Sequence, residues 1–217
     1  AGFPISSPGD FEAVRRVAEE IRHPIIAALA HANNTAVDRA WEALKGAERP
    51  RIHVFIASSE IHLMHQLRKN REQVIQLAVD NVARAKAHCT DVEFSPMDAT
   101  RTETEYLVQL LRAVIEAGAT TINIPDTVGY AIPEEFASLL THLQKEVTGL
   151  GKEVALSIHC HNDLGLSVAN SLAAIKVGAR QVEGCINGIG ERAGNASLEE
   201  VIMSLHTRKD FFHITTN

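Results

Sequence analysis

The chain has 217 residues, of which 45% are hydrophobic and 22% charged, and its formal net charge is −6. This length and composition are sufficient for one domain with a sizeable core, and they exclude wholesale disorder. The acidic balance and an aromatic content of only 5% argue against a nucleic-acid partner, which requires phosphate neutralisation or base stacking.

Helical and extended patterns alternate along the whole chain. In chain order, the expected elements are a helix over 8–21, a strand over 25–29, a helix over 35–45, a strand over 52–57, helices over 59–68 and 71–88, a strand over 92–95, a helix over 103–117, a strand over 121–124, a helix over 133–147, a strand over 154–159, a helix over 167–177, a strand over 181–186 and a helix over 198–207. Ser7 is expected to cap the first helix.

This alternation predicts an α/β fold, because parallel strands need crossover connections of a dozen or more residues. The strands are unbroken apolar runs, as in a parallel sheet covered on both faces. A doubly wound sheet and a (β/α)8 barrel both fit the pattern. A closed barrel would need two strands more than the six expected here. The stub Gly2-Phe3-Pro4 resembles the end of one of them, so the other would lie upstream. No linker divides residues 1–217, which predicts a single domain.

The sequence also carries signs of its compartment. The three cysteines, Cys89, Cys160 and Cys185, are odd in number and form no C-x-x-C pair, which disfavours a disulfide framework. No apolar run approaches the roughly 18 residues of a membrane-spanning helix, and residues 1–8 lack the regions of a signal peptide. We therefore expect a cytoplasmic protein without membrane contacts.

Polar residues collect at the ends of the predicted strands, where both parallel α/β architectures bind ligands. They are His53, Ser58, Ser95, Asp98, Asn123, Asp126, Thr127, His159, His161, Asn162, Asp163, Asn187, Glu191, Arg192 and Asn195. A scatter of surface residues would not recur after strand upon strand, so the pattern predicts an active site at this edge.

His159 and His161 are two residues apart on a strand, so their side chains share a face and could bind one metal ion. A bare pair of this kind is more often exposed or satisfied in the core. His53, inside an apolar strand, is either a satisfied core residue or points into a pocket. The loop over 188–195 lacks the G-x-G-x-x-G spacing of a dinucleotide site, and its glycines would let the backbone approach a ligand.

Six segments together resemble the catalytic barrel of the 2-isopropylmalate synthase family, which also includes homocitrate and citramalate synthases. They lie at residues 2–12, 51–58, 91–96, 121–129, 159–165 (His-Cys-His-Asn-Asp-Leu-Gly) and 187–196 (Asn-Gly-Ile-Gly-Glu-Arg-Ala-Gly-Asn-Ala). The resemblance implies a TIM barrel and a metal-assisted condensation of acetyl-CoA with 2-oxoisovalerate. This is the step of leucine biosynthesis that yields 2-isopropylmalate. It also implies a homodimer.

The resemblance also implies roles for individual residues. His159, His161 and Asn195 would bind a divalent metal ion, and this mixed donor set does not separate Mg²⁺, Mn²⁺ and Zn²⁺. The residues that would line the 2-oxoacid pocket are His53, Ser95, Asn123, Pro125 and Thr127.

The chain departs from the family pattern at several points. From the resemblance we expect the first strand, which carries an Arg-Asp pair, most of the second strand and the C-terminal regulatory domain to be missing from these residues. Met97 stands where the family has Glu, and His31 where it has Arg. A thioether cannot transfer a proton, so no residue is assigned as catalytic, with Glu191 the one carboxylate suggested near the metal. A related synthase or lyase acting on another 2-oxoacid, or a non-catalytic barrel homologue, remains an alternative.

We expect these 217 residues to be a fragment or an impaired variant. On this basis the isolated chain should not release thiol from acetyl-CoA in the presence of 2-oxoisovalerate and a divalent metal. A thiol-reactive dye measures this release, and a rate well above that of a metal-only blank would contradict the expectation.

Overall fold

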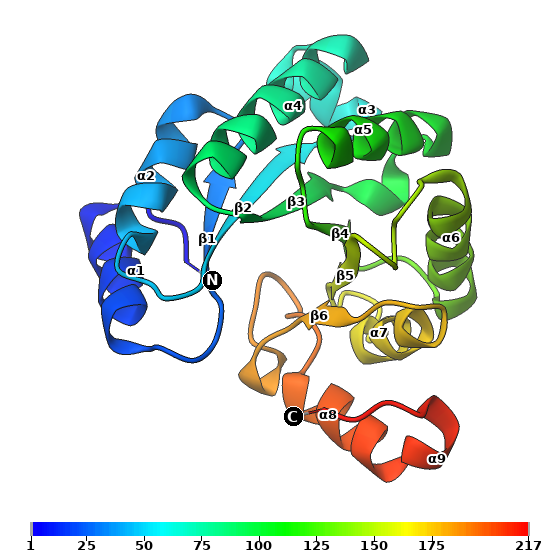
Figure 1. The fold of residues 1–217 in the computed structure, drawn as a ribbon. Helices are drawn as coiled ribbons and strands as arrows, with labels where there is room; N and C mark the ends of the chain where they lie inside the picture. The colour runs from blue at the N-terminus through cyan, green and yellow to red at the C-terminus, as the bar shows by residue number, and fades with distance from the viewer. Residues whose placement is uncertain (1, 217) are drawn as a thin grey trace. The chain divides into compact units, whose positions relative to one another are not determined.

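The computed structural model describes residues 2–216, so the expectations about Ala1 and Asn217 lie outside the described residues. Figure 1 shows helices and strands alternating along the chain. The strands are β1 (Ile26–His31), β2 (Pro50–Ala57), β3 (Asp91–Met97), β4 (Thr121–Asp126), β5 (Ala155–Cys160) and β6 (Gln181–Glu183). The longer helices are α1 (Pro8–Glu20), α2 (Asn34–Leu44), α4 (Arg71–His88), α5 (Thr104–Glu116), α6 (Pro133–Glu146), α7 (Ser167–Lys176) and α8 (Leu198–Thr207).

The order of the strands in the sheet decides between the two architectures that the sequence left open. The order is β1-β2-β3-β4-β5-β6, and β1 with β2, β2 with β3, β3 with β4 and β5 with β6 pair in parallel. A doubly wound sheet reverses its strand order at a switch point, whereas a barrel adds each strand beside the last. The sequential order therefore fits the barrel architecture, and the upstream strands stay a prediction.

The chain divides into two compact units. Unit 1 runs up to Met97 and includes Thr102–Ile122, and unit 2 comprises Asp98–Arg101 and the chain from Asn123 onward. The two units share β4, whose first two residues belong to unit 1. The expectation of one domain over 1–217 stays a prediction.

The core of unit 1 is built on the long pairing of β2 with β3. Seven positions are in register, from Arg51 opposite Asp91 to Ala57 opposite Met97. Apolar side chains on these strands are fully buried, among them Ile52, Val54, Val92 and Phe94. Their burial confirms that these runs are strands covered by helices. In α1 the capping expectation is also confirmed, because the Ser7 hydroxyl accepts a hydrogen bond from the Asp10 amide.

Unit 2 has a separate cluster of apolar residues under its last helices. Ile175 of α7 packs with Ala196, Val201 and Leu205, which are all buried. On β5, Leu156 and Ile158 are also buried. The apolar runs of this unit therefore support the end of β5, where the histidine pair lies.

Two expected elements differ in the structure. The helix expected over 59–68 is a short α3 (Glu60–His62) followed by a π-helical segment, η1 (Leu63–Leu67), which ends where Arg68 turns left-handed. The strand expected over 181–186 stops at Glu183. Beyond it, Gly184 meets the carbonyl of Ala196 so closely that a side chain would collide, and a 3-10 turn, η3 (Ile186–Gly188), follows.

Two short elements were not expected from the sequence. They are a 3-10 turn, η2 (Ala99–Arg101), and a four-residue helix, α9 (Lys209–Phe212). Neither is long enough to show a helical repeat of apolar residues. Within residues 2–216, no helix has both the length and the apolarity that crossing a bilayer requires.

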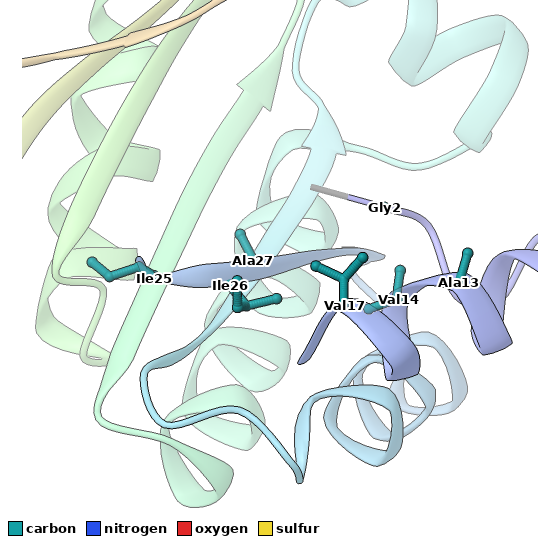
Figure 2. A pocket seen from close by; sticks show the side chains of 7 residues that line it. All are labelled: Gly2, Ala13, Val14, Val17, Ile25, Ile26 and Ala27. Atoms are coloured by element: carbon teal, nitrogen blue, oxygen red, sulfur yellow. The ribbon is translucent and has the colours of Figure 1, made fainter. Parts of the chain in front are cut away.

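An apolar groove of about 250 Å³ lies in unit 1 beside the start of β1 (Figure 2). It is lined by Gly2, Ala13, Val14, Val17, Ile25, Ile26 and Ala27. None of these side chains can transfer a proton or bind a metal ion. The groove therefore offers no acid, base or metal ligand.

The buried β2–β3 pairing predicts a large effect of truncating Phe94. Phe94→Ala should lower the free energy of unfolding by about 3–5 kcal/mol, because the cavity adds to the lost transfer energy. Phe211, half exposed in α9, is the matched control, and Phe211→Ala should change stability by less than about 1 kcal/mol. Urea denaturation followed by circular dichroism measures both. Equal losses would show that the β2–β3 core does not dominate stability.

Candidate metal centre

The two histidines at the end of β5 face one another. Cys160 between them is fully buried and points to the opposite side, toward Ser171 of α7. The Nε2 atoms of His159 and His161 are 3.1 Å apart. Two nitrogens that each bind one ion at about 2.1 Å in neighbouring positions of an octahedron are about 3 Å apart. The predicted convergence of the pair is therefore present in the structure.

Asn195 reaches the same face through a backbone pairing. It is bridged to His161 in antiparallel fashion, and directly opposed residues of such a pair place their side chains on one face. Its amide nitrogen donates to the Cys185 sulfur at 3.4 Å. Its carbonyl oxygen Oδ1 is buried and has no hydrogen-bond partner among residues 2–216. A buried acceptor without a donor is costly, and a cation would relieve that cost.

Glu183 adds a carboxylate that the sequence analysis did not select. It is in register with His159 across the β5–β6 pairing, and its Oε2 lies 3.4 Å from Nδ1 of His159. The side-chain amide of Asn123 donates to the same oxygen at 3.3 Å. The one signal in the sequence is a charged residue inside the strand expected over 181–186, but the spacing does not show that it faces His159.

Burial also favours the neutral form of the His161 imidazole. The pKa of His161 lies below its ordinary value, mainly because burial penalises the cation and secondly because His159 is close. A metal ion needs the lone pair of a neutral imidazole. His161 is therefore disposed to act as a ligand near neutral pH.

The end of β4 supplies the other residues expected in unit 2. Pro125 is buried. The Thr127 hydroxyl accepts a hydrogen bond from the Asp98 amide at 2.9 Å, and the Thr127 carbonyl accepts one from Arg192. Thr127 therefore helps to hold the neighbouring loops together.

Glu191 is exposed and lies 3.7 Å from Arg192. The carboxylate in contact with a histidine of the pair is that of Glu183.

In unit 1, His53 and Ser95 form a buried hydrogen-bonded pair. Their Nε2 and Oγ atoms are 2.6 Å apart. Glu93, opposite His53 in the β2–β3 register, lies 3.8 Å from its Nδ1 and accepts a hydrogen bond from Arg51. His53 therefore has partners in the folded chain, and its place in a 2-oxoacid pocket stays a prediction. Met97 at the end of β3 is half-buried, and its carbonyl accepts from Ser58.

Unit 2 therefore offers two imidazoles and an amide oxygen on one face, with a carboxylate beside the first imidazole. Nitrogen and neutral oxygen donors of this kind suit several divalent cations. An orphaned amide oxygen and two convergent nitrogens fit a metal ion better than they fit a hydrogen-bonded core.

Comparisons with known proteins give a consistent family. A family model described as HMGL-like matches residues 1–217. Among curated proteins, 2-isopropylmalate synthase of Syntrophus aciditrophicus is 61% identical over 216 residues, and that of Pyrococcus furiosus is 58% identical over 216 residues. These matches cover 100% of this chain but only 42% and 43% of the two relatives.

The comparison with solved structures agrees on the fold. The hydroxymethylglutaryl-CoA lyase of Pseudomonas aeruginosa superposes with a TM-score of 0.78 at 20% identity, covering 95% of this chain and 70% of the lyase. At that identity the likeness shows a shared fold and carries nothing about the reaction.

The burial of the thiols predicts selective alkylation. Cys89 and Cys160 are buried, and burial raises the pKa of both thiols, whereas Cys185 is partly exposed beside Asn195. Because the thiolate is the reactive form, iodoacetamide should label Cys185 at least about ten times faster than the other two. Peptide mass spectrometry of the native chain measures the rates, with urea-unfolded chain as the control. Comparable labelling of Cys160 would contradict the packing around β5.

Proposed function

This chain belongs to the HMGL-like family, and from that premise we propose that it carries the metal-binding part of an enzyme that condenses acetyl-CoA with 2-oxoisovalerate to give 2-isopropylmalate. The observation that carries the proposal is the convergence of His159, His161 and Asn195 on one face of unit 2. The names of the curated relatives and their 54–61% identity support the choice of reaction. The chain covers about two-fifths of those relatives.

The proposed reaction removes a proton from the methyl group of acetyl-CoA, and the resulting enolate carbon attacks the keto carbon of 2-oxoisovalerate. Water then cleaves the thioester and releases free coenzyme A. A bound divalent cation would supply Lewis-acid polarisation of the keto group. Mg²⁺, Mn²⁺ and Zn²⁺ all suit the donor set.

The chain's own residues would hold that ion in a defined way. The two imidazoles would bind through Nε2, and Asn195 would add its orphaned Oδ1. Glu183 contacts the other ring nitrogen of His159 and would fix the tautomer and orientation of that imidazole. Asn123 in turn fixes Glu183. The arrangement resembles the carboxylate–histidine pairs that commonly support metal ligands.

We also propose that His53 and Ser95 bind the 2-oxoacid, as do Asn123, Pro125 and Thr127. The support in unit 1 is a buried, mutually hydrogen-bonded pair that could donate to a carboxylate. A homodimer, which the family resemblance implies, and a cytoplasmic location, which the cysteine pattern favours, stay predictions.

Metal binding is the direct test. The chain should bind about one Mn²⁺ or Co²⁺, and His161→Ala should weaken binding by more than the ~10–100-fold that outer residues contribute, because it removes a donor. The exposed His206 of α8 provides the matched control His206→Ala, which should bind as the parent does. Isothermal titration measures the affinities. A parent chain without metal affinity, or a His161→Ala variant with parental affinity, would overturn the proposal.

The choice of 2-oxoacid is tested with the metal-loaded chain. Thermal unfolding is followed with 2-oxoisovalerate, 2-oxoglutarate and pyruvate at equal concentrations. A ligand that binds the folded state raises Tm in proportion to RT ln(1 + [L]/Kd), so the preferred substrate should give the largest shift. The proposal expects 2-oxoisovalerate to rank first, and only when metal is present. A larger shift with another 2-oxoacid would assign the related synthase instead.

A further inference from the structure

The loop that carries Asn195 is held by an exposed arginine with no metal-binding atoms of its own. We define the glycine loop as residues 184–197, which follow β6. Arg192 in this loop makes a two-pronged contact with Asp163, its Nε donating to Oδ1 and its Nη2 to Oδ2, both at 2.7 Å. The same Nη2 donates to the Thr127 carbonyl at 2.9 Å. One side chain thus fastens the loops that follow β4, β5 and β6.

Asp163, the ion-pair partner of Arg192, is itself packed closely against the loop that follows β4. Asp163 packs against Gly129 so tightly that a side chain at position 129 would collide with the Asp163 carboxylate and backbone. The Leu164 amide donates to the Gly129 carbonyl at 3.2 Å, which ties the same two loops together. The two bonds of this ion pair therefore hold the Arg192 and Asp163 side chains in one relative orientation, unlike a loose surface contact.

The backbone of the glycine loop connects the Arg192–Asp163 ion pair to Asn195 and restricts the Asn195 side chain. Arg192 adopts a left-handed backbone at φ 56°, a conformation that non-glycine residues hold only when their surroundings enforce it. Next to it, a side chain on Gly190 would come within 2.8 Å of the Asn195 amide nitrogen. The Gly194 carbonyl accepts from the Asn162 amide at 2.9 Å, beside the bridge between Asn195 and His161. The Asn195 amide is therefore confined by the loop backbone on one side and by Cys185 on the other.

We propose that Arg192 is a positioning residue for the metal centre, acting through Asp163 and Thr127 to hold the glycine loop so that Asn195 Oδ1 faces the ion held by His159 and His161. The proposal rests on the proposed function, because it presumes a divalent ion at the histidine pair. The bonds of the Arg192 guanidinium go to Asp163 and Thr127 rather than to His159, His161 or Asn195. Its guanidinium fork is the part that matters, since lysine carries the charge but cannot bridge both carboxylate oxygens.

The test compares metal affinity across matched variants of the whole chain. Arg192→Gln should weaken Co²⁺ binding by about 10–100-fold, the range of residues that orient ligands, and should alter the visible absorption spectrum of the bound Co²⁺. Arg192→Lys should recover only part of the affinity. Arg208→Gln, which removes an exposed arginine paired with Asp210 at 3.5 Å, is the control and should bind as the parent does.

Two further variants separate positioning from general stability. Asp163→Asn should weaken Co²⁺ binding as Arg192→Gln does, and the double variant should be no weaker than the poorer single, because both remove one contact. Gly190→Ala should weaken binding without touching that contact, whereas Gly9→Ala, in an open part of α1, should not. Metal-free Tm values show whether each variant is folded.

A second readout follows the loop without metal. If Arg192 holds the glycine loop, Cys185 should be alkylated severalfold faster in Arg192→Gln than in the parent, while the rate at Cys89 stays unchanged. Parental Co²⁺ affinity and spectrum in Arg192→Gln, or additive losses in the double variant, would overturn the inference while leaving the metal centre intact. A parent chain that binds no metal would instead overturn the proposed function, and the inference with it.

Discussion

The register at the end of β5 is the constraint on which the rest of the candidate site depends. Side chains alternate along a strand, so His159 and His161 share one face and Cys160 takes the other. A slip of one residue would bury both imidazoles against α7 and expose the thiol. Cys160 is fully buried, and this apolar side of the strand resists such a slip. Packing of the Cys160 face of β5 thereby fixes the opposite face as the one that carries the two imidazoles.

From that register, two pairings bring in the remaining groups. The parallel pairing with β6 sets Glu183 beside His159, and the antiparallel bridge sets Asn195 beside His161. Several polar atoms of this cluster have partners, but Oδ1 of Asn195 and the Nδ1 atoms of His159 and His161 are buried without a hydrogen bond among residues 2–216. Native proteins tolerate such costs mainly where function requires them. The unpaired Oδ1 of Asn195, on the same face as the two Nε2 atoms, is thus an argument for a ligand.

Features set by residues close together in the sequence could be predicted, whereas features set by contacts between distant segments could not. The histidine pair was predictable because a two-residue repeat is local, and α4 was predicted with its observed bounds because its caps lie in its own sequence. Glu183 and Glu93 were missed because their partners are set by register between strands, which residue spacing does not reveal. The end of β6 was misplaced because Gly184 is shaped by the approach of Ala196, a contact made only in the folded chain.

The division into two units bears differently on the proposed metal ligands and on the proposed 2-oxoacid residues. All three proposed metal ligands come from unit 2, so the ion should depend on the packing of β5, β6 and α7 rather than on the β2–β3 core. The pair His53 and Ser95 belongs to unit 1 and depends on that core. Asn123, Pro125 and Thr127, which are also proposed to bind the 2-oxoacid, belong to unit 2, so damage to the β2–β3 core should affect only part of the 2-oxoacid residues and none of the metal ligands directly. The exposed Arg192 matters in this setting because the glycine loop has little apolar burial to fix it, so hydrogen bonds must do so.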